Sequence, residues 1–400
     1  MAYAAVKGGQ EAVAESIRLL EKNRAASQAD LDIKTLEKGM SLLIDRIMGE
    51  AGFYAPAYAA LALKQSAGSP EEAVFLLRAY RSTLSRSYLS LPLDGADMVI
   101  HRRVSAAFKD IPGGQFLGAT FDYTHRLLNF DLLNTGRNDS AEEDAVRPEN
   151  PAGPEAPLYA RRVSEELRRE GLVNIEEDDE DPWDITEDPL VFPAPRSARL
   201  QTLARADTGY VSGLAYAAIR GFGSGHPTVG ELRTGTLEAI IPHPLIRGEK
   251  LFVGDITVTE VESLFPEEDR ETKKEAKDDP LKIMASGQGD RADTSVNVLS
   301  LGLGYGMVFG RSDAKAIAMS ILDYSLNTAD SGSGENHGSA DTGGGTSILE
   351  NQEFVLLHGD CLEMNGFISH LKLPHYVTFQ SKLDRVRHTR KKTGGPHDGL

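Results

Sequence analysis

Three polar segments constrain the fold most, because they divide the apolar sequence into separate blocks. Residues 137–157 are rich in proline and acid, 266–280 carry mixed charge, and 330–347 are mostly glycine, serine and other polar residues. Such compositions lack the apolar side chains that a core needs and are typical of flexible inserts. A packed core must therefore come from the blocks around them.

The distribution of charge argues against several classes of protein. The net charge is −17, and residues 138–190 hold 18 acidic and 5 basic side chains, a local charge of −13. The remainder is near neutral, so we expect no broadly basic surface for nucleic acid. No apolar run reaches the roughly 18 residues of a membrane span, and the N-terminus does not resemble a signal peptide. We therefore expect a cytoplasmic protein, in which the single Cys361 excludes an internal disulfide.

The spacing of apolar residues predicts an α+β fold. Helical spacing recurs before residue 135, as in Val13, Ile17 and Leu20, and we expect these stripes to face a common core. Ser69 before Pro70 predicts a capped helix start. Three later segments rich in β-branched and aromatic residues predict strands of a central mixed sheet: 236–244, 251–265 and 303–310.

These patterns predict five regions along the chain. They are an N-terminal helical region (1–135), an acidic insert with a short helix (136–195), a central α+β domain (196–328), a flexible Gly/Ser insert (329–350) and a C-terminal histidine turn, helix and basic tail (351–400).

The densest cluster of polar residues lies at 102–130. Glycines let backbone N–H groups approach an anion, and a helix N-terminus attracts negative charge. Cations, carboxylates and a histidine coincide here, which favours a functional loop; the alternative is a tight turn with capping side chains. Its candidate residues are Lys109, Asp110, Gly113, Gly114, Asp122, His125 and Arg126.

A second cluster lies at 219–235 among five glycines. It lacks the Gly-Lys-Ser/Thr ending of a Walker loop and the leading strand of a dinucleotide fingerprint. A binding loop and a simple connection between helix and strand are both open. The candidates are Arg220, His226, Glu231 and Arg233.

The stretch "SHLKLPHY" places His370 and His375 five residues apart, with Pro374 between them. On a regular helix or strand the two rings would diverge. They converge only if the chain bends, which Pro374 favours. The pair is then half of a zinc site or a coincidence, and Cys361 is a weak candidate for a third ligand.

Several long motifs together resemble one family, the I subunit of the bacterial carbon–phosphorus lyase complex (PhnI). They are "AVKGGQEA", "LALKQSAGSPEEAVFLLRAYRSTL", "KDIPGGQFLGATFDYTHRLL", "GHPTVGELRTG" and "EFVLLHGD…GFISHLKLPHYV". The resemblance spans nearly the whole chain. The polar inserts and the basic tail depart from the family pattern, so nothing is carried over to them.

The resemblance implies a function in phosphonate breakdown. With PhnG, PhnH and PhnL, the family joins a phosphonate to ATP: the phosphonate displaces adenine from C1′ and gives ribose 1-phosphonate 5-triphosphate. The I subunit alone is associated with nucleosidase activity. It also assembles with PhnG, PhnH and PhnJ, and its paired histidines bind a metal, expected to be zinc, near PhnJ. That pair corresponds to His370 and His375 here.

Breaking an N-glycosidic bond develops positive charge on the ribose, which a carboxylate stabilises. An acid must protonate the leaving purine, and cationic side chains must bind the triphosphate. We assign the carboxylate role to Asp110, Asp122 or Glu231, and the acid role to His125 or His226. We assign binding of the triphosphate to four cationic side chains and the Gly113–Gly114 turn; the cations are Lys109, Arg126, Arg220 and Arg233. The competing hypothesis is a non-catalytic scaffold that lends two histidines to an interfacial metal.

Overall fold

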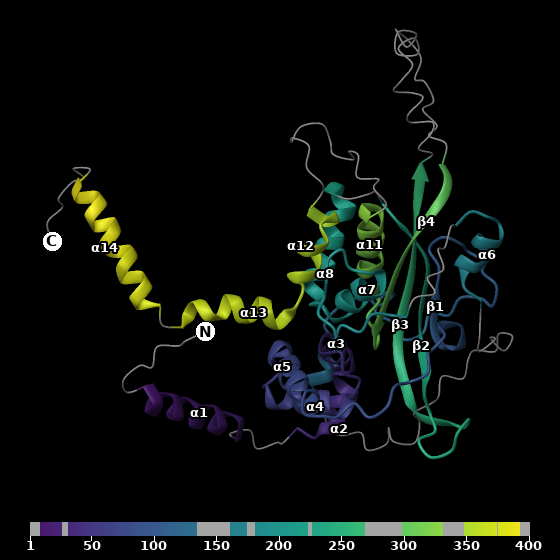
Figure 1. Cartoon of the computed structure of the whole chain (residues 1–400). Helices are drawn as coiled ribbons and strands as arrows, with labels where there is room; N and C mark the ends of the chain where they lie inside the picture. The colour runs from purple at the N-terminus through teal and green to yellow at the C-terminus, as the bar shows by residue number, and fades with distance from the viewer. Residues whose placement is uncertain are drawn as a thin grey trace, which may run out of the picture.

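The computed structural model of the 400-residue chain is shown in Figure 1. It describes residues 9–25, 31–133, 161–173, 181–222, 226–268, 298–330, 348–373 and 375–392. The acidic segment 137–157, the Gly/Ser segment 331–347, most of the mixed-charge segment, Pro374 and the end of the basic tail lie outside these residues.

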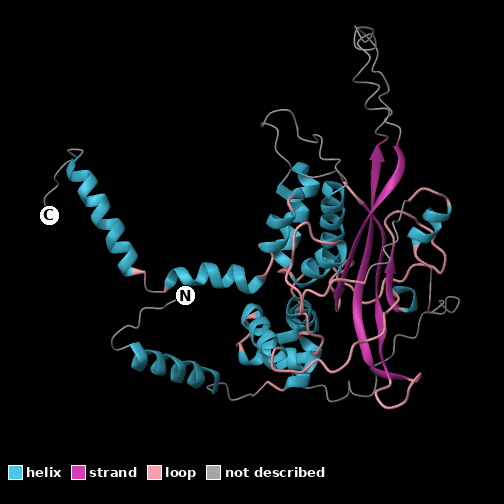
Figure 2. Cartoon of the chain, viewed as in Figure 1, coloured by secondary structure: helices cyan, strands magenta, loops and turns pink. Residues whose placement is uncertain are grey.

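An antiparallel sheet of four strands forms the centre of the molecule (Figure 2). Its order is β1 (Val99–Val104), β2 (Thr228–Pro242), β3 (Lys250–Glu268) and β4 (Val298–Phe309). The three predicted strands are confirmed, but β2 begins at Thr228 rather than at 236 and β4 begins at Val298 rather than at 303. β1 was not expected, and the described strands pair antiparallel throughout, where a mixed sheet was predicted.

Helices cover one face of the sheet. α11 (Asp313–Asp330) lies directly on β3 and β4, flanked by α7 (Arg196–Arg205), α8 (Thr208–Ala217) and α12 (Gln352–Leu357). Alternate β4 residues facing α11 are glycines. A Cβ on Gly304 would lie 2.0 Å from the Ser320 carbonyl oxygen, so only glycine permits this close approach. The largest apolar core fills this layer.

A second helical layer comes from the N-terminal region. It comprises α2 (Ile33–Gly39), α3 (Ser41–Ala51), α4 (Pro56–Gln65) and α5 (Pro70–Arg81), which enclose their own apolar core. The predicted cap of α5 is confirmed, since Ser69 Oγ accepts from the Glu72 N–H at 3.3 Å.

Short elements complete the chain. The opposite face of the sheet is covered by α6 (Val163–Arg169) and the turn η1 (Gly95–Asp97). The remaining turns are η2 (Phe130–Leu133), the π-helical η3 (Ala218–Phe222) and η4 (Ile348–Glu350).

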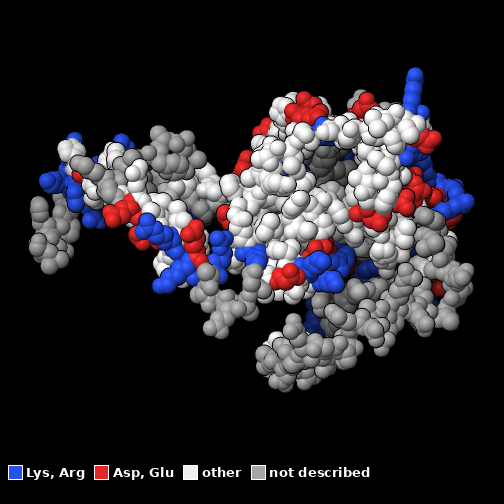
Figure 3. Space-filling view, turned by 90° about the horizontal axis from the view of Figure 1, so that it is seen from below, with Lys and Arg blue, Asp and Glu red and all other residues white. Residues whose placement is uncertain are grey.

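Two arms project from this body in Figure 1. One is α1 (Gly9–Ala25); the other runs through α13 (Cys361–Ser369), η5 (His370–Lys372) and α14 (Tyr376–Lys392). The expectation that the α1 stripe faces a core is wrong: Val13, Ile17 and Leu20 are more than half exposed. In the view from below (Figure 3), Lys and Arg gather on the projecting arm, and further groups of them lie on the body.

The α+β fold class is confirmed, with helices packed on one antiparallel sheet. Within the described ranges, no helix is both long enough and apolar enough to cross a bilayer.

Candidate functional site

The first candidate cluster forms a largely exposed loop, residues 105–129, between β1 and η2. The Gln115 amide donates to the Lys109 carbonyl oxygen at 2.8 Å and closes its first turn. Gly113 and Gly114 follow at φ 86° and 78°, the left-handed region that glycine adopts without strain. Sequence alone therefore located a real turn; we call residues 105–129 the glycine loop.

Asp122 fastens the far part of the glycine loop to the body. Its Oδ2 accepts from Arg102 at 2.6 Å, and Arg102 also pairs with Asp313 at the start of α11, 3.1 Å away. Hydrogen bonding from Thr120 and then Arg102 lowers the pKa of the Asp122 carboxyl. Asp122 therefore stays ionised at neutral pH while half of its side chain faces solvent.

Four other candidates on the glycine loop point into solvent: Lys109, Asp110, His125 and Arg126 are all exposed. Arg126 has φ 55°, uncommon for a residue with a side chain. The apolar side chains beside them are exposed too: Leu127 and Leu128 are more than four-fifths accessible. A polar and apolar surface of this kind is typical of an interface that a partner or ligand completes.

Glu231 lies beneath the loop rather than in it. It sits in β2, 2% exposed, and accepts from Arg103 Nε at 2.5 Å and from the Val163 N–H at 2.8 Å. Arg103 then donates to the carbonyl oxygen of Pro112 at 2.5 Å, directly before the glycine pair. The buried Glu231–Arg103 pair thus holds the turn of the glycine loop from below.

Arg233 belongs to the same buried layer. It forms an ion pair with Glu260, which also accepts from Arg162 at 2.8 Å and from the Tyr305 hydroxyl at 2.8 Å. Burial, and then Glu260, raise the pKa of the neighbouring Glu262 carboxyl to about 7. Arg233 was expected to bind a triphosphate. Among the described residues, its ion pair is with Glu260 in β3, which keeps Arg233 in the buried layer and away from the glycine loop.

Arg220 and His226 border the segment 223–225, which is not described. Arg220 lies over the Tyr216 ring, 5.9 Å from its centroid, and is exposed. His226 is also exposed, three residues before Val229, whose carbonyl oxygen accepts from the Ala106 N–H at 3.0 Å. The start of β2 therefore brings the second cluster beside the first residues of the glycine loop.

Sequence reasoning missed the charged layer that surrounds these residues: Arg102, Arg103, Arg162, Glu260, Glu262 and Tyr305. One signal was present. Glu260 and Glu262 alternate in a strand, which places both on one face. Their partners come from distant parts of the chain, and that pairing needs the tertiary structure.

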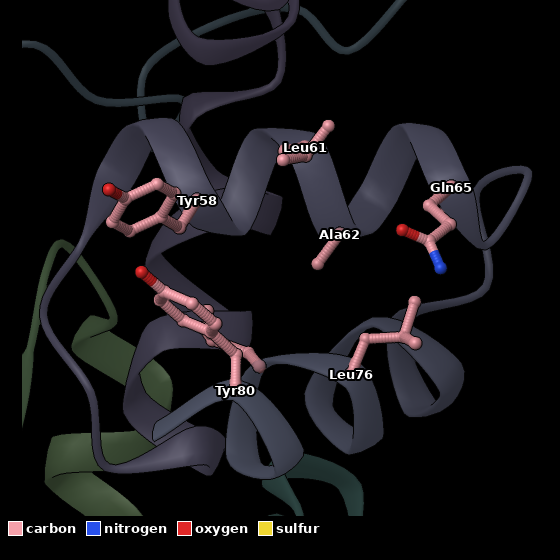
Figure 4. A pocket seen from close by; sticks show the side chains of 7 residues that line it. Tyr58, Leu61, Ala62, Gln65, Leu76 and Tyr80 are labelled. Carbon is pink, nitrogen blue, oxygen red and sulfur yellow. The ribbon is translucent and has the colours of Figure 1, made fainter. Parts of the chain in front are cut away.

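A shallow pocket of about 220 Å³ lies between α4 and α5 (Figure 4). Tyr58 and Tyr80 close one end, with ring centroids 5.1 Å apart, and the other lining residues are Leu61, Ala62, Gln65, Leu76 and Leu77. The lining offers no carboxylate, histidine or cation for the expected chemistry, so we do not place the site here.

His370 and His375 do converge, as the sequence predicted. Their ring centroids are 5.3 Å apart, and each Nδ1 faces a backbone carbonyl oxygen, of Phe367 and Leu373 respectively. This contact leaves Nε2 of each ring available to a metal. Imidazoles that share one zinc ion through nitrogens at about 2.0–2.1 Å have ring centres roughly 5–6 Å apart, and the separation of these two rings lies in that range.

Cys361 does not complete this site. It is fully buried against the N-terminal helices, where burial raises the pKa of its thiol to about 12. The described part of the chain holds no group of three or more potential metal-ligating side chains. A metal held by the two histidines would need its other ligands from elsewhere.

Comparisons with known proteins cover nearly the whole chain. A sequence model of the family described as "Bacterial phosphonate metabolism protein (PhnI)" matches residues 2–393. The "Putative C-P lyase subunit protein HtxH" of Stutzerimonas stutzeri is 41% identical over 397 residues, 98% of this chain and 97% of the relative.

Two further relatives carry the name "Alpha-D-ribose 1-methylphosphonate 5-triphosphate synthase subunit PhnI". The protein of Escherichia coli (strain K12) is 39% identical over 98% of this chain and 99% of its own length. That of Rhizobium meliloti (strain 1021) is 39% identical over 100% of this chain and 98% of its own length. Matches of this extent show that the chain belongs to the PhnI family of bacterial phosphonate metabolism proteins.

Proposed function

We propose that the chain is a subunit of a carbon–phosphorus lyase system in which a phosphonate displaces adenine from ATP. The observation that carries this proposal is the full-length similarity to two relatives named as subunits of a ribose 1-methylphosphonate 5-triphosphate synthase. The proposed partners are PhnG, PhnH, PhnJ and PhnL, and ATP is the proposed nucleotide substrate.

The glycine loop is the proposed site of this reaction. Loss of adenine leaves positive charge on the ribose, and a carboxylate that remains ionised stabilises it. The paired and half-exposed Asp122 suits that role, with Asp110 as the second candidate. His125 or His226 would protonate the departing purine, and Lys109, Arg126 and Arg220 would bind the triphosphate over the Gly113–Gly114 turn.

Glu231 and Arg233 take a different part in this proposal. Both are buried in ion pairs, so neither is placed to touch a ribose or a triphosphate. We assign Glu231 the role of a positioning residue. It accepts a hydrogen bond from Arg103, and Arg103 also donates to the Pro112 carbonyl oxygen at the turn of the glycine loop. Arg233 then stabilises the sheet on which that turn rests.

The test is adenine release by the chain with PhnG, PhnH and PhnL, with and without a phosphonate. Adenine should form only with the phosphonate present. Asp122→Asn or Asp110→Asn should lower the rate about 100-fold, whichever carboxylate acts at C1′. Glu238→Gln, an exposed strand glutamate, is the matched control. Full activity in both aspartate variants, each shown to be folded, would remove both carboxylates from the mechanism.

We further propose that His370 and His375 bind a zinc ion whose remaining ligands come from a neighbouring subunit or a substrate. Their convergence on the projecting arm supports this. A zinc ion there would supply a Lewis acid. Metal content should rise when the chain assembles with PhnJ, and His370→Ala or His375→Ala should abolish the rise. His388→Ala, on α14, is the control and should leave it unchanged.

A second candidate function is a scaffold without chemistry of its own. The exposed apolar side chains of the arm, including Phe367 (71%) and Val377 (72%), favour it, because such faces bury against partners. Adenine release by the isolated chain separates the two hypotheses. A scaffold would release none, whereas the proposed enzyme subunit would act as a nucleosidase.

A further inference from the structure

Beside the glycine loop lies a further histidine, His101, in β1. Its side chain is exposed, and its Nε2 is 3.0 Å from the hydroxyl oxygen of Thr236 on β2. Within the described part of the chain, no hydrogen bond reaches Nδ1, the other ring nitrogen. One nitrogen of the ring is therefore held on the sheet, and the other is free to act on a ligand.

A β-bulge decides where this ring points. The register of β1 shifts between Ile100 and Arg102, so His101 is the extra residue of the bulge. The His101 ring contacts Thr236, and Arg102 lies directly opposite Thr234. These two threonines are two residues apart in β2 and share one face of the sheet. His101 and Arg102 therefore point to the same face, although they are neighbours in a strand.

The glycine loop brings Asp122 to this face. Arg102 donates to Asp122 Oδ2 at 2.6 Å and to the Leu117 carbonyl oxygen at 2.5 Å. The loop also contacts His101 itself, because a Cβ on Gly118 would lie 2.8 Å from the His101 carbonyl oxygen. Strand and loop thus bring the Asp122 carboxylate and the His101 imidazole to one side of the sheet.

The two histidines already considered for the acid role are less well placed. His125 lies on the exposed glycine loop, and His226 borders the segment 223–225. His226 Nδ1 also faces the Pro227 carbonyl oxygen at 3.0 Å. A group on a strand is positioned more precisely than a group on a loop, which favours His101.

We propose that His101 donates the proton to the departing purine; this inference rests on the proposed function. As a phosphonate oxygen bonds to C1′, the C1′–N9 bond breaks and its electron pair goes to the purine. The imidazolium Nδ1 gives its proton to N7 of the purine, so adenine leaves neutral and His101 becomes a neutral imidazole. Thr236 Oγ1 accepts from Nε2–H throughout, which leaves Nδ1 as the nitrogen that exchanges its proton. Solvent then returns a proton to the ring.

The test compares two nucleotides in the assay with PhnG, PhnH, PhnL and a phosphonate. The leaving base of ATP needs a proton, whereas that of 7-methyladenosine 5′-triphosphate does not, because it is already positively charged. His101→Gln should release adenine from ATP about 100-fold more slowly than the wild type. It should release 7-methyladenine at close to the wild-type rate, after subtraction of the uncatalysed rate.

Three controls accompany this comparison. The aspartate variant that loses activity with ATP should lose it with both nucleotides, because positive charge develops on the ribose in either case. Thr236→Val should slow adenine release by about tenfold, the effect of one lost hydrogen bond, and Thr236→Ser should restore it. His358→Gln, which changes an exposed histidine at the end of α12, should match the wild type.

Thermal unfolding separates this role from a structural one. His101→Gln should unfold at the wild-type midpoint, because the ring is exposed. Undiminished adenine release by the folded variant, or equal losses with both nucleotides, would overturn the role of His101 and leave the proposed function intact. Absence of adenine release by the wild-type assembly would overturn both.

Discussion

The covered polar face of the sheet and the glycine loop contain the same kinds of residue, but these residues differ in burial and in ion pairing. On the sheet face, Arg103, Glu231 and Glu260 are each no more than 2% exposed and are matched in ion pairs. On the loop, Asp110 and His125 face solvent. A buried charge must be paired to be tolerated, whereas an exposed one remains available to a ligand.

The two regions are linked by hydrogen bonds. Arg103, which is paired with Glu231 in the buried layer, also donates to the Pro112 carbonyl oxygen, so the buried layer sets the position of the exposed loop. Substitutions in the buried layer should therefore lower stability, and those on the loop should change function alone.

The largest expected effect is that of Glu231→Ala. Removing this carboxylate leaves Arg103 buried without its partner, which costs about 3–5 kcal/mol of unfolding free energy. Urea denaturation monitored by circular dichroism measures the change. A loss below about 1 kcal/mol would show that the sheet face does not depend on this pair.

Glu262→Gln tests the same face through pH. The Glu262 pKa is about 7 in the folded chain, against the ordinary 4.5, so the folded state binds the proton more tightly. Protonated Glu262 therefore stabilises the folded state below pH 4.5, and this stabilisation is lost as pH rises through about 7. Across that window the wild type should lose roughly 3 kcal/mol relative to Glu262→Gln.

The readout is the unfolding free energy of both proteins at several pH values. Glu238→Gln, an exposed glutamate on β2, should follow the wild type throughout. Parallel curves for wild type and Glu262→Gln would mean that Glu262 titrates normally.

Gly304→Ala tests the opposite, apolar face of the sheet. The added methyl group would meet the Ser320 carbonyl oxygen at 2.0 Å and force α11 away from β4. Overpacking of this kind costs about 1–3 kcal/mol, measured as a lower urea midpoint. Gly254→Ala in β3 is the matched control, because nothing lies within 4 Å of its added Cβ.

The smallest effect on stability is expected in the glycine loop. Asp110→Ala and His125→Ala should change the unfolding free energy by no more than about 0.5 kcal/mol, because both side chains are exposed. Thermal melts of the isolated chain check this. A large loss in either variant would mean that the loop has structural contacts and would weaken the contrast with the sheet.

Local chemistry made part of this structure predictable. Ser69 and Pro70 specify a helix start through neighbouring backbone groups, and the β-branched runs specify β2, β3 and β4. Convergence of His370 and His375 was also predicted, because only a bend in a short segment is needed. β1 was missed because "VIHRRV" alternates poorly, and its pairing with β2 supplies what its own sequence lacks.

The sequence alone determined the elements that depend on residues a few positions apart: helix starts, strands and the histidine turn. Only the tertiary structure decided the fate of the charged residues. Glu231 and Arg233 looked like site residues until pairing over long sequence distances buried them, while Asp110 and His125 stayed exposed. Burial sets whether a charge must be neutralised within the chain, and burial is a property of the packed molecule.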